Sequence, residues 1–447
     1  MRKAAVVVLI LAAGHAAQAQ PMPVPADQAT QGSTAAAPPV AQAGRSYRGL
    51  FGAGSGARPG GHLLDLTASV YQEYGTLSRS EFSFDPEVQG IGWFLGVRSR
   101  LALERAWQNT RFGLRGESSF RYFRDARETT TPRVRLEVAL DHNARQYRLN
   151  SVRLSGSVDY EPYYTLSIFP TPVAETGGTA IVPTSRDDLL FRGARYVYAQ
   201  SFEAERQVAP RAYVTVFESW RYTSASAAGF DVDSVRVGAR YGYRLSRYAS
   251  LRVGYAYQTG HYGLEAARRL EAHDIDLSYD YRKPLSRSRR TTVGFGVGSS
   301  RVTTGAGPEW MIVGTANLRH ELGAGWFLQG DYLRNVQLVE GFAEPFFVNT
   351  GSASLGGFFG RRVEFLASSG YSMGTIGTGS DTYESLQGSA RLRLAMASFL
   401  AVDVEGLVNR NIFDGRTTLP GVIPATTGDA SRWAVRCNVA MWLPLSR

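Results

Sequence analysis

Hydrophobic and polar residues alternate with a period of two along most of the chain, from His62 to about Leu443. Over 433–441, bulky apolar side chains occupy every second position, and alanine, arginine and asparagine stand between them. Successive side chains of a β-strand point to opposite faces of its sheet, so this pattern predicts strands with one apolar and one polar face. The same alternation over 234–243 and 251–258, on either side of a short polar connection, predicts a β-hairpin.

Turn residues divide this region into about 18 predicted strands, and about 16 is the alternative if hairpins are miscounted. Short connections alternate with longer polar stretches such as 165–189 and 411–432. Antiparallel strands with short turns at one end and long loops at the other form an up-and-down barrel, which is the all-β fold that we predict. The predicted strands begin near residues 62, 90, 111, 132, 150, 190, 212, 232, 250, 273, 291, 310, 326, 349, 363, 383, 399 and 432.

The composition of the two strand faces indicates a membrane outside the barrel and water inside it. So many strands enclose a lumen that one layer of side chains cannot fill, so an apolar lining would leave a void. The polar face is rich in Gly, Ser, Thr, Arg, Asp and Gln, as in the run Thr292-x-Gly294-x-Gly296-x-Gly298. Tyr and Trp recur near the predicted strand ends, which is typical of the aromatic girdles of outer-membrane barrels. We therefore predict a transmembrane β-barrel.

The N-terminal segment predicts secretion. Two cations precede the apolar run 4–13, and Ala17 and Ala19 follow it at the spacing of a signal-peptidase site. The apolar run is shorter than the roughly 18 residues that a membrane-spanning helix requires. These features, together with the barrel, predict a location in the bacterial outer membrane. The predicted organisation is a signal peptide over 1–19, a flexible periplasmic leader rich in Pro, Ala and Gly over 20–61, and the barrel over 62–447.

Composition and charge exclude some further classes. The 447 residues are 44% hydrophobic and 20% charged, with 48 Gly, which fits neither a disordered nor a collagen-like chain. Cys437 is the only cysteine, so an intramolecular disulfide is excluded. The formal net charge is +10, but the cations are scattered over the chain, so we expect no nucleic-acid partner.

Three stretches carry a resemblance to a known family. They are His62–Ser69, the strand–turn–strand unit Tyr241–Tyr257 and the ending Met441–Leu445. On these stretches the chain resembles bacterial outer-membrane proteins of the β-barrel porin family. The resemblance implies an outer-membrane channel or scaffold, which in some members is associated with polysaccharide export. It identifies no functional residue.

Charged residues on the polar face are the candidate selectivity residues of the lumen. Three arginines lie on two neighbouring predicted strands, and three aspartates lie on the next one. Opposed basic and acidic walls would orient dipolar solutes and set an ion preference. The alternative is that these charges neutralise one another along the wall, and both interpretations are open at this stage. The candidates are Arg236, Arg240, Arg252, Asp274, Asp276 and Asp280.

A second set of charges favours the neutralising arrangement, because its members alternate in sign over three consecutive predicted strands. This set comprises Arg391, Arg393, Asp403, Glu405 and Arg436.

The long connection 165–189 is a candidate constriction loop. Its prolines and its Gly177-Gly178 pair would let it fold into the pore, whereas the alternative is a loop that stays outside. The charged residues that it would carry are Glu175, Arg186, Asp187 and Asp188.

The function predicted from these features is a porin-like channel for passive diffusion of small hydrophilic solutes or ions. The alternatives are an exopolysaccharide-export or biofilm-associated component and a structural or adhesive barrel with an occluded lumen. We expect no enzyme, metal or cofactor, because the sequence lacks a nucleophile elbow and metal-ligand spacing. His261 or His273 with Asp274 and Asp276 is the one suggestive catalytic pairing. Expected partners are outer-membrane lipid and lipopolysaccharide, small hydrophilic solutes, and in the export alternative a polysaccharide; the barrel is also compatible with a homo-oligomer.

Overall fold

The computed structural model describes most of the barrel region. The described residues are 61–75, 93–123, 129–143, 149–165, 175–176, 179–180, 190–225, 231–262, 269–284, 290–304, 307–323, 325–337, 346–360, 362–376, 382–414 and 428–446. The predicted signal peptide and all but the last residue of the predicted leader lie outside them. Among the described residues, no helix is long and apolar enough to cross a membrane.

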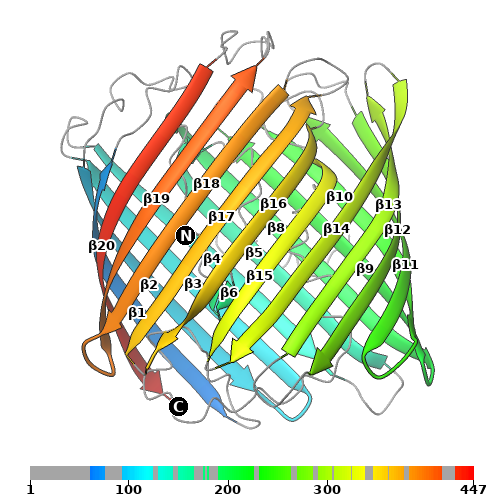
Figure 1. Ribbon diagram of the computed structural model, residues 1–447, viewed down its shortest axis with the longest axis horizontal. Coiled ribbons are helices and arrows are strands. Elements are labelled where there is room, and N and C mark those ends of the chain that lie inside the picture. Colours follow the sequence, from blue (N-terminus) through cyan, green and yellow to red (C-terminus); the bar gives the residue numbers. More distant parts are fainter. Residues whose placement is uncertain are drawn as a thin grey trace, which may run out of the picture.

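Eighteen long antiparallel strands form one closed barrel (Figure 1). The barrel closes because β1 pairs with β2 on one side and with β20, the last strand of the chain, on the other. This confirms the predicted fold class and the larger of the two predicted strand counts. The strands are β1 (His62–Gly75), β2 (Trp93–Ala106), β3 (Thr110–Phe123), β4 (Thr129–His142), β5 (Leu149–Thr165), β8 (Leu190–Ala209), β9 (Ala212–Ala225), β10 (Val232–Arg244), β11 (Ala249–Tyr262), β12 (Arg269–Pro284), β13 (Arg290–Thr304), β14 (Gly307–Gly323), β15 (Trp326–Gln337), β16 (Phe346–Phe359), β17 (Val363–Ile376), β18 (Thr382–Ala395), β19 (Leu400–Asp414) and β20 (Gly428–Ser446).

The predicted strand starts agree closely with the observed ones. The largest differences are at β12, which begins at residue 269 rather than near 273, and at β20, which begins at 428 rather than near 432. Both strands extend beyond the apolar alternation into polar residues such as Glu271 and Asp429. Pairing with the neighbouring strand holds these residues in the ladder, although their side chains give no periodic apolar signal.

The two faces of each strand differ as the sequence predicts. Bulky apolar side chains on the outer face are exposed, for example Val253, Ile275 and Val297, which are 48%, 51% and 54% exposed. The alternating polar residues point into the barrel, where several charged groups are buried, among them Arg252 and Arg391. Soluble barrels bury apolar residues and expose polar ones, so this barrel has the inverted arrangement.

An ion pair links β1 and β20 on the inner face of the barrel. We call this junction of the first and last strands the seam. The guanidinium of Arg436 donates hydrogen bonds to Glu73, with Nε 2.9 Å from Oε2, and also approaches Glu405 on β19 at 3.4 Å. The side chains of Arg436 and Glu73 are both almost completely buried. The ring of Tyr71 lies beside the same guanidinium, 5.2 Å away.

Replacing Glu73 tests this seam. Glu73→Leu leaves the buried guanidinium of Arg436 with Glu405 alone, so we expect the free energy of unfolding to fall by about 1–3 kcal/mol. Urea unfolding of the refolded full chain in lipid vesicles measures this change. The control is Glu104→Leu, because the ion pair that Glu104 makes among the described residues is long, 3.8 Å to the half-exposed Arg115. An equal loss in both variants would contradict a special role of the seam.

Candidate functional site: the charged lumen wall

The six predicted lumen residues all lie on the inner face of β10, β11 and β12 and form one cluster. A terminal guanidinium nitrogen of Arg236 is 2.9 Å from Oδ2 of Asp274, and one of Arg252 is 2.7 Å from Oδ2 of Asp280. Since the three strands are neighbours, the basic and acidic residues share one sector of the wall rather than facing each other across the pore. The structure therefore brings the six residues together in the neutralising arrangement.

Gly254 allows Arg240 and Asp276 to approach each other across the strand between them. The register aligns Arg240 on β10 with Gly254 on β11, and Gly254 with Asp276 on β12. A Cβ atom at Gly254 would collide with Oδ1 of Asp276 and would lie 2.9 Å from Cγ of Arg240. The missing side chain thus leaves the space in which the side chains of Arg240 and Asp276 lie.

An aromatic ring supports two of these arginines. The guanidinium of Arg240 lies 4.4 Å from the ring centre of Phe217 on β9, and that of Arg236 lies 5.9 Å from it. Contacts of this kind are attractive because the face of an aromatic ring carries partial negative charge. Phe217 was not among the residues predicted from the sequence. Phe217 lies between Thr215 and Ser219 on the polar face of β9, and this position in the alternation could have identified it as a lumen residue.

The charges of the second predicted set are neutralised as expected, although Arg391 pairs with a residue outside the set. Arg391 contacts Glu364 at 3.1 Å, and Arg393 contacts Asp403 at 3.1 Å. Asn438 donates a further hydrogen bond to Asp403, at 3.0 Å. Together with the seam pair of Arg436, these contacts cross β17 to β20 and reach β1.

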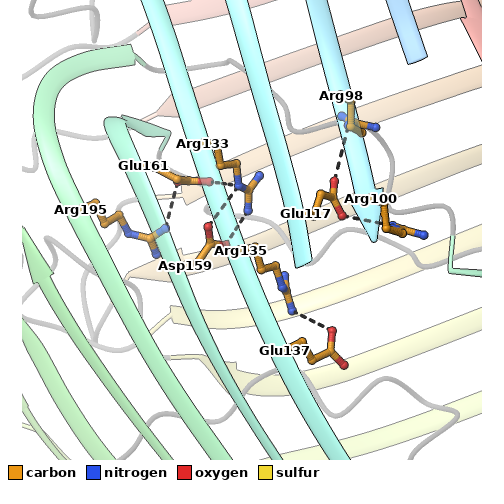
Figure 2. Close-up of polar contacts among 9 residues, drawn as sticks. All are labelled: Arg98, Arg100, Glu117, Arg133, Arg135, Glu137, Asp159, Glu161 and Arg195. Carbon is orange, nitrogen blue, oxygen red and sulfur yellow. Dashed lines mark hydrogen bonds and ion pairs between the residues drawn. The ribbon is translucent and has the colours of Figure 1, made fainter. Parts of the chain in front are cut away.

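A third set of ion pairs, which the sequence analysis missed, continues the pattern over β2 to β8 (Figure 2). Glu117 lies between Arg98 and Arg100, at 3.5 and 3.2 Å. Arg133 contacts Asp159 at 2.7 Å and Glu161 at 2.8 Å, and Arg195 reaches the other oxygen of Glu161 at 3.3 Å. The alternation of side chains along each strand predicts that these residues lie on the inner face. It does not predict the register between strands, which decides which charges meet.

The lumen wall therefore has a charged sector and a mostly neutral one. The charged sector runs from β17 through β20 and β1 to β12. Over β13 to β16 the inner face presents mainly glycines and hydroxyl groups, for example that of Thr350, which hydrogen bonds to Ser372 on β17 at 3.0 Å. Even here charges are linked, because Arg319 reaches Asp331 through the amide of Gln329.

An apolar collar, also missed by the sequence analysis, lies on the inner face near the long-loop ends of the strands. Val232, Leu270, Ala272 and Val302 pack together there. Phe346 and Tyr383, whose ring centres are 5.2 Å apart, are both completely buried nearby along the same end. Apolar side chains thus lie at this end of the lumen over β10 to β13 and over β16 to β18.

The predicted constriction loop falls largely outside the described residues. Glu175 belongs to β6 (Glu175–Thr176), which pairs with β7 (Thr179–Ala180) in a short hairpin. Figure 1 draws this hairpin within the outline of the barrel, well below the rim. Arg186, Asp187 and Asp188, and the side chain of Glu175, lie outside the described residues.

The suggestive histidine–aspartate pairing is not formed by either histidine. The register aligns His261 with Asp233 on β10 and with Arg269 on β12, not with Asp274 or Asp276. His273 points to the outer face, where its Nδ1 is 2.8 Å from the hydroxyl of Tyr255, whereas Asp274 points into the lumen. Within the described residues, no group of three or more His, Cys, Asp and Glu side chains is arranged to hold a metal ion.

The chain is similar in fold to solved outer-membrane porins. OccK2 (OpdF) of Pseudomonas aeruginosa in complex with glucuronate is 10% identical, with a TM-score of 0.47, over 87% of this chain and 100% of that one. OpdK of P. aeruginosa with vanillate is 10% identical, with a TM-score of 0.45, over 86% and 98% of the two chains. OccAB3 of Acinetobacter baumannii is 9% identical, with a TM-score of 0.43, over 86% and 99%.

No family model matches the sequence, and a search of curated proteins also gives no match. At these low identities and TM-scores, the structural similarities assign neither a family nor a solute to this chain.

A double-mutant cycle tests the ion pairs of the charged sector. For Arg252→Ala and Asp280→Ala, whose groups are 2.7 Å apart and mostly buried, we expect a coupling energy of about 1–3 kcal/mol in urea unfolding. For Arg135→Ala and Glu137→Ala, which are 4.0 Å apart and more exposed, we expect about 0–1 kcal/mol. Equal coupling in the two cycles would show that burial does not strengthen the inner pair.

Proposed function

We propose that this protein is a channel of the bacterial outer membrane through which small hydrophilic solutes or ions diffuse passively. The single observation that supports this most strongly is the inverted barrel: apolar side chains cover its outside, and hydrogen-bonded polar and charged side chains cover its inside. Outer-membrane lipid and lipopolysaccharide would contact the outer face.

Closure of the barrel supports the membrane location. Hydrocarbon offers no hydrogen-bond partner, so a membrane-spanning backbone must pair all of its N–H and C=O groups internally. The pairing of β1 with both β2 and β20 leaves no open edge in the barrel wall. A barrel of this size also needs polar contents, because its lumen is too wide for a packed side-chain core.

Because the charges of the wall are paired, we infer that the channel selects solutes by their dipoles as much as by their net charge. In the cluster of Arg236, Arg240 and Asp274, guanidinium and carboxylate groups lie side by side, so a passing solute meets both donors and acceptors. We propose that the six predicted residues of β10 to β12 set the ion preference, and that the connection 165–189 narrows the pore.

Two other functions stay as alternatives to test. Polysaccharide export would be supported by a path of aromatic rings inside the lumen, but many exposed aromatic side chains, such as Tyr241, Tyr255 and Trp310, lie on the outer face. A structural barrel with an occluded lumen would be supported by the absence of ion conduction.

Reversing two charges tests the channel and its selectivity in one experiment. The full chain and the variant Arg236→Glu/Arg240→Glu are reconstituted in planar bilayers, and the reversal potential is measured in a salt gradient. The variant places two glutamates beside Asp274 and Asp276, where Arg236 now pairs with Asp274 and Arg240 lies near Asp276. We therefore expect the reversal potential to shift toward cation preference.

The matched control carries the same change of net charge outside the lumen wall. Arg211→Glu/Arg247→Glu alters two exposed arginines in the short turns after β8 and β10, and we expect the reversal potential to stay unchanged. If the unmodified chain conducts no current, the channel proposal is refuted. If all three proteins conduct with the same ion preference, only the assignment of selectivity to these residues is refuted. Block of the current by an oligosaccharide, with no block by glucuronate, would favour the export function.

A further inference from the structure

A charged side chain lies at mid-height on the mostly apolar outer face. Glu218 lies midway along β9, between the exposed Val216 on its own strand and Val237 on the adjacent part of β10. Its side chain is exposed and makes no hydrogen bond or ion pair with any described residue. Other outward charges of the described strands, such as Arg301 and Arg334, lie near strand ends, where water and lipid headgroups begin.

A second unpaired polar group lies beside Glu218. Gln200 on β8 is aligned with Trp220 on β9 and so points to the same outer face. Its amide also makes no hydrogen bond with the described residues. On the far side of Gln200, the register places Gly156 of β5, where an added Cβ would meet only the carbonyl oxygen of Ala199 at 3.8 Å. The surface next to Gln200 is therefore open to close approach.

The barrel geometry places these two polar groups at nearly the same height. They are separated by one strand spacing of about 4.8 Å and by two residues, or about 6.6 Å, along the strand. With a strand tilt of about 40°, these two displacements nearly cancel along the barrel axis. Gln200 and Glu218 therefore lie at similar heights, about 8 Å apart around the barrel wall. In Figure 1 the front strands rise from lower left to upper right, and each later strand up to β20 lies to the left of the preceding one. Since paired residues face each other at right angles to the strands, each strand is higher at equal register than the preceding one.

We propose that Gln200, Glu218 and Trp220 form the contact face of a homodimer in the membrane. A two-fold axis along the membrane normal, between β8 and β9, sets β9 of one copy against β8 of the other. Each Gln200 amide then donates a hydrogen bond to the partner's Glu218, and the contact occurs twice. An amide carries both a donor and an acceptor, so it satisfies the carboxyl group in either protonation state.

The self-complementarity of the patch favours a second copy of this chain over lipid as its neighbour. Acyl chains offer no hydrogen-bond donor, so an exposed carboxyl group at this depth is costly in a monomer. The amide of Gln200 is such a donor, and it lies at nearly the same height as Glu218. The apolar side chains around it, Phe202, Val216 and Val237, would be buried in the same contact, and Gly156 leaves room for the partner's side chains.

Disulfide trapping tests this arrangement and its register. Cys437, on the outer face of β20, is first replaced by Ser, and the variants Gln200→Cys and Glu218→Cys are then co-expressed as two full-length chains. Oxidation of isolated outer membranes should give a cross-linked dimer from the mixture and far less from either variant alone. The control pair Leu277→Cys and Phe295→Cys has the same relative register on β12 and β13 and should not cross-link.

A second measurement, of the oligomeric state, distinguishes a contact between two copies of the chain from a face that is exposed to lipid. By light scattering of the purified full chain in detergent, we expect a dimer for the unmodified protein and for Glu218→Gln, and a monomer for Glu218→Leu. A monomeric unmodified chain, or cross-linking of the control pair equal to that of the mixture, would overturn the proposal. The proposal rests on the membrane location proposed above, and a chain absent from the outer-membrane fraction would instead refute that location. Ion conduction by a monomer would leave the channel function intact.

Discussion

Internal pairing of the backbone is the constraint on which this structure depends. Each strand has one apolar face that is exposed and one polar face that is crowded, so neither face alone could hold an isolated strand in place. Pairing every strand with two neighbours, including β1 with β20, satisfies the backbone without a conventional hydrophobic core. The seam between the two ends of the chain then becomes the place where the contact of Arg436 with Glu73 matters most.

The same inversion explains why the inner charges are paired. A wall that is lined by long side chains brings guanidinium and carboxylate groups into partial burial, and an unpaired buried charge is costly. Neighbouring strands supply the partners, as Arg133 shows with Asp159 and Glu161. Glu218 faces the same cost on the opposite face, where the described part of its own chain supplies no partner and the proposed second copy would.

The alternation of side chains predicts much of the fold but little of the pairing. The hairpin of β10 and β11 follows directly from the period of two, and every long strand has its predicted counterpart. By contrast, the contact of Arg236 with Asp274 spans an intervening strand and depends on register and on side-chain reach, neither of which periodicity reports. Phe217 was missed because an aromatic residue was expected on the outer face, and the apolar collar around Val232 and Val302 because polar residues were expected inside.

The central claim is that successive residues of one strand face water and lipid in turn. It is tested most directly by cysteine labelling along β14 in a Cys437→Ser background, at Thr315, Ala316, Asn317 and Leu318. The account predicts that a water-soluble thiol reagent modifies the cysteines at Thr315 and Asn317 in intact outer-membrane vesicles and spares those at Ala316 and Leu318. Equal labelling at all four positions, or labelling at Ala316 and Leu318 alone, would contradict it.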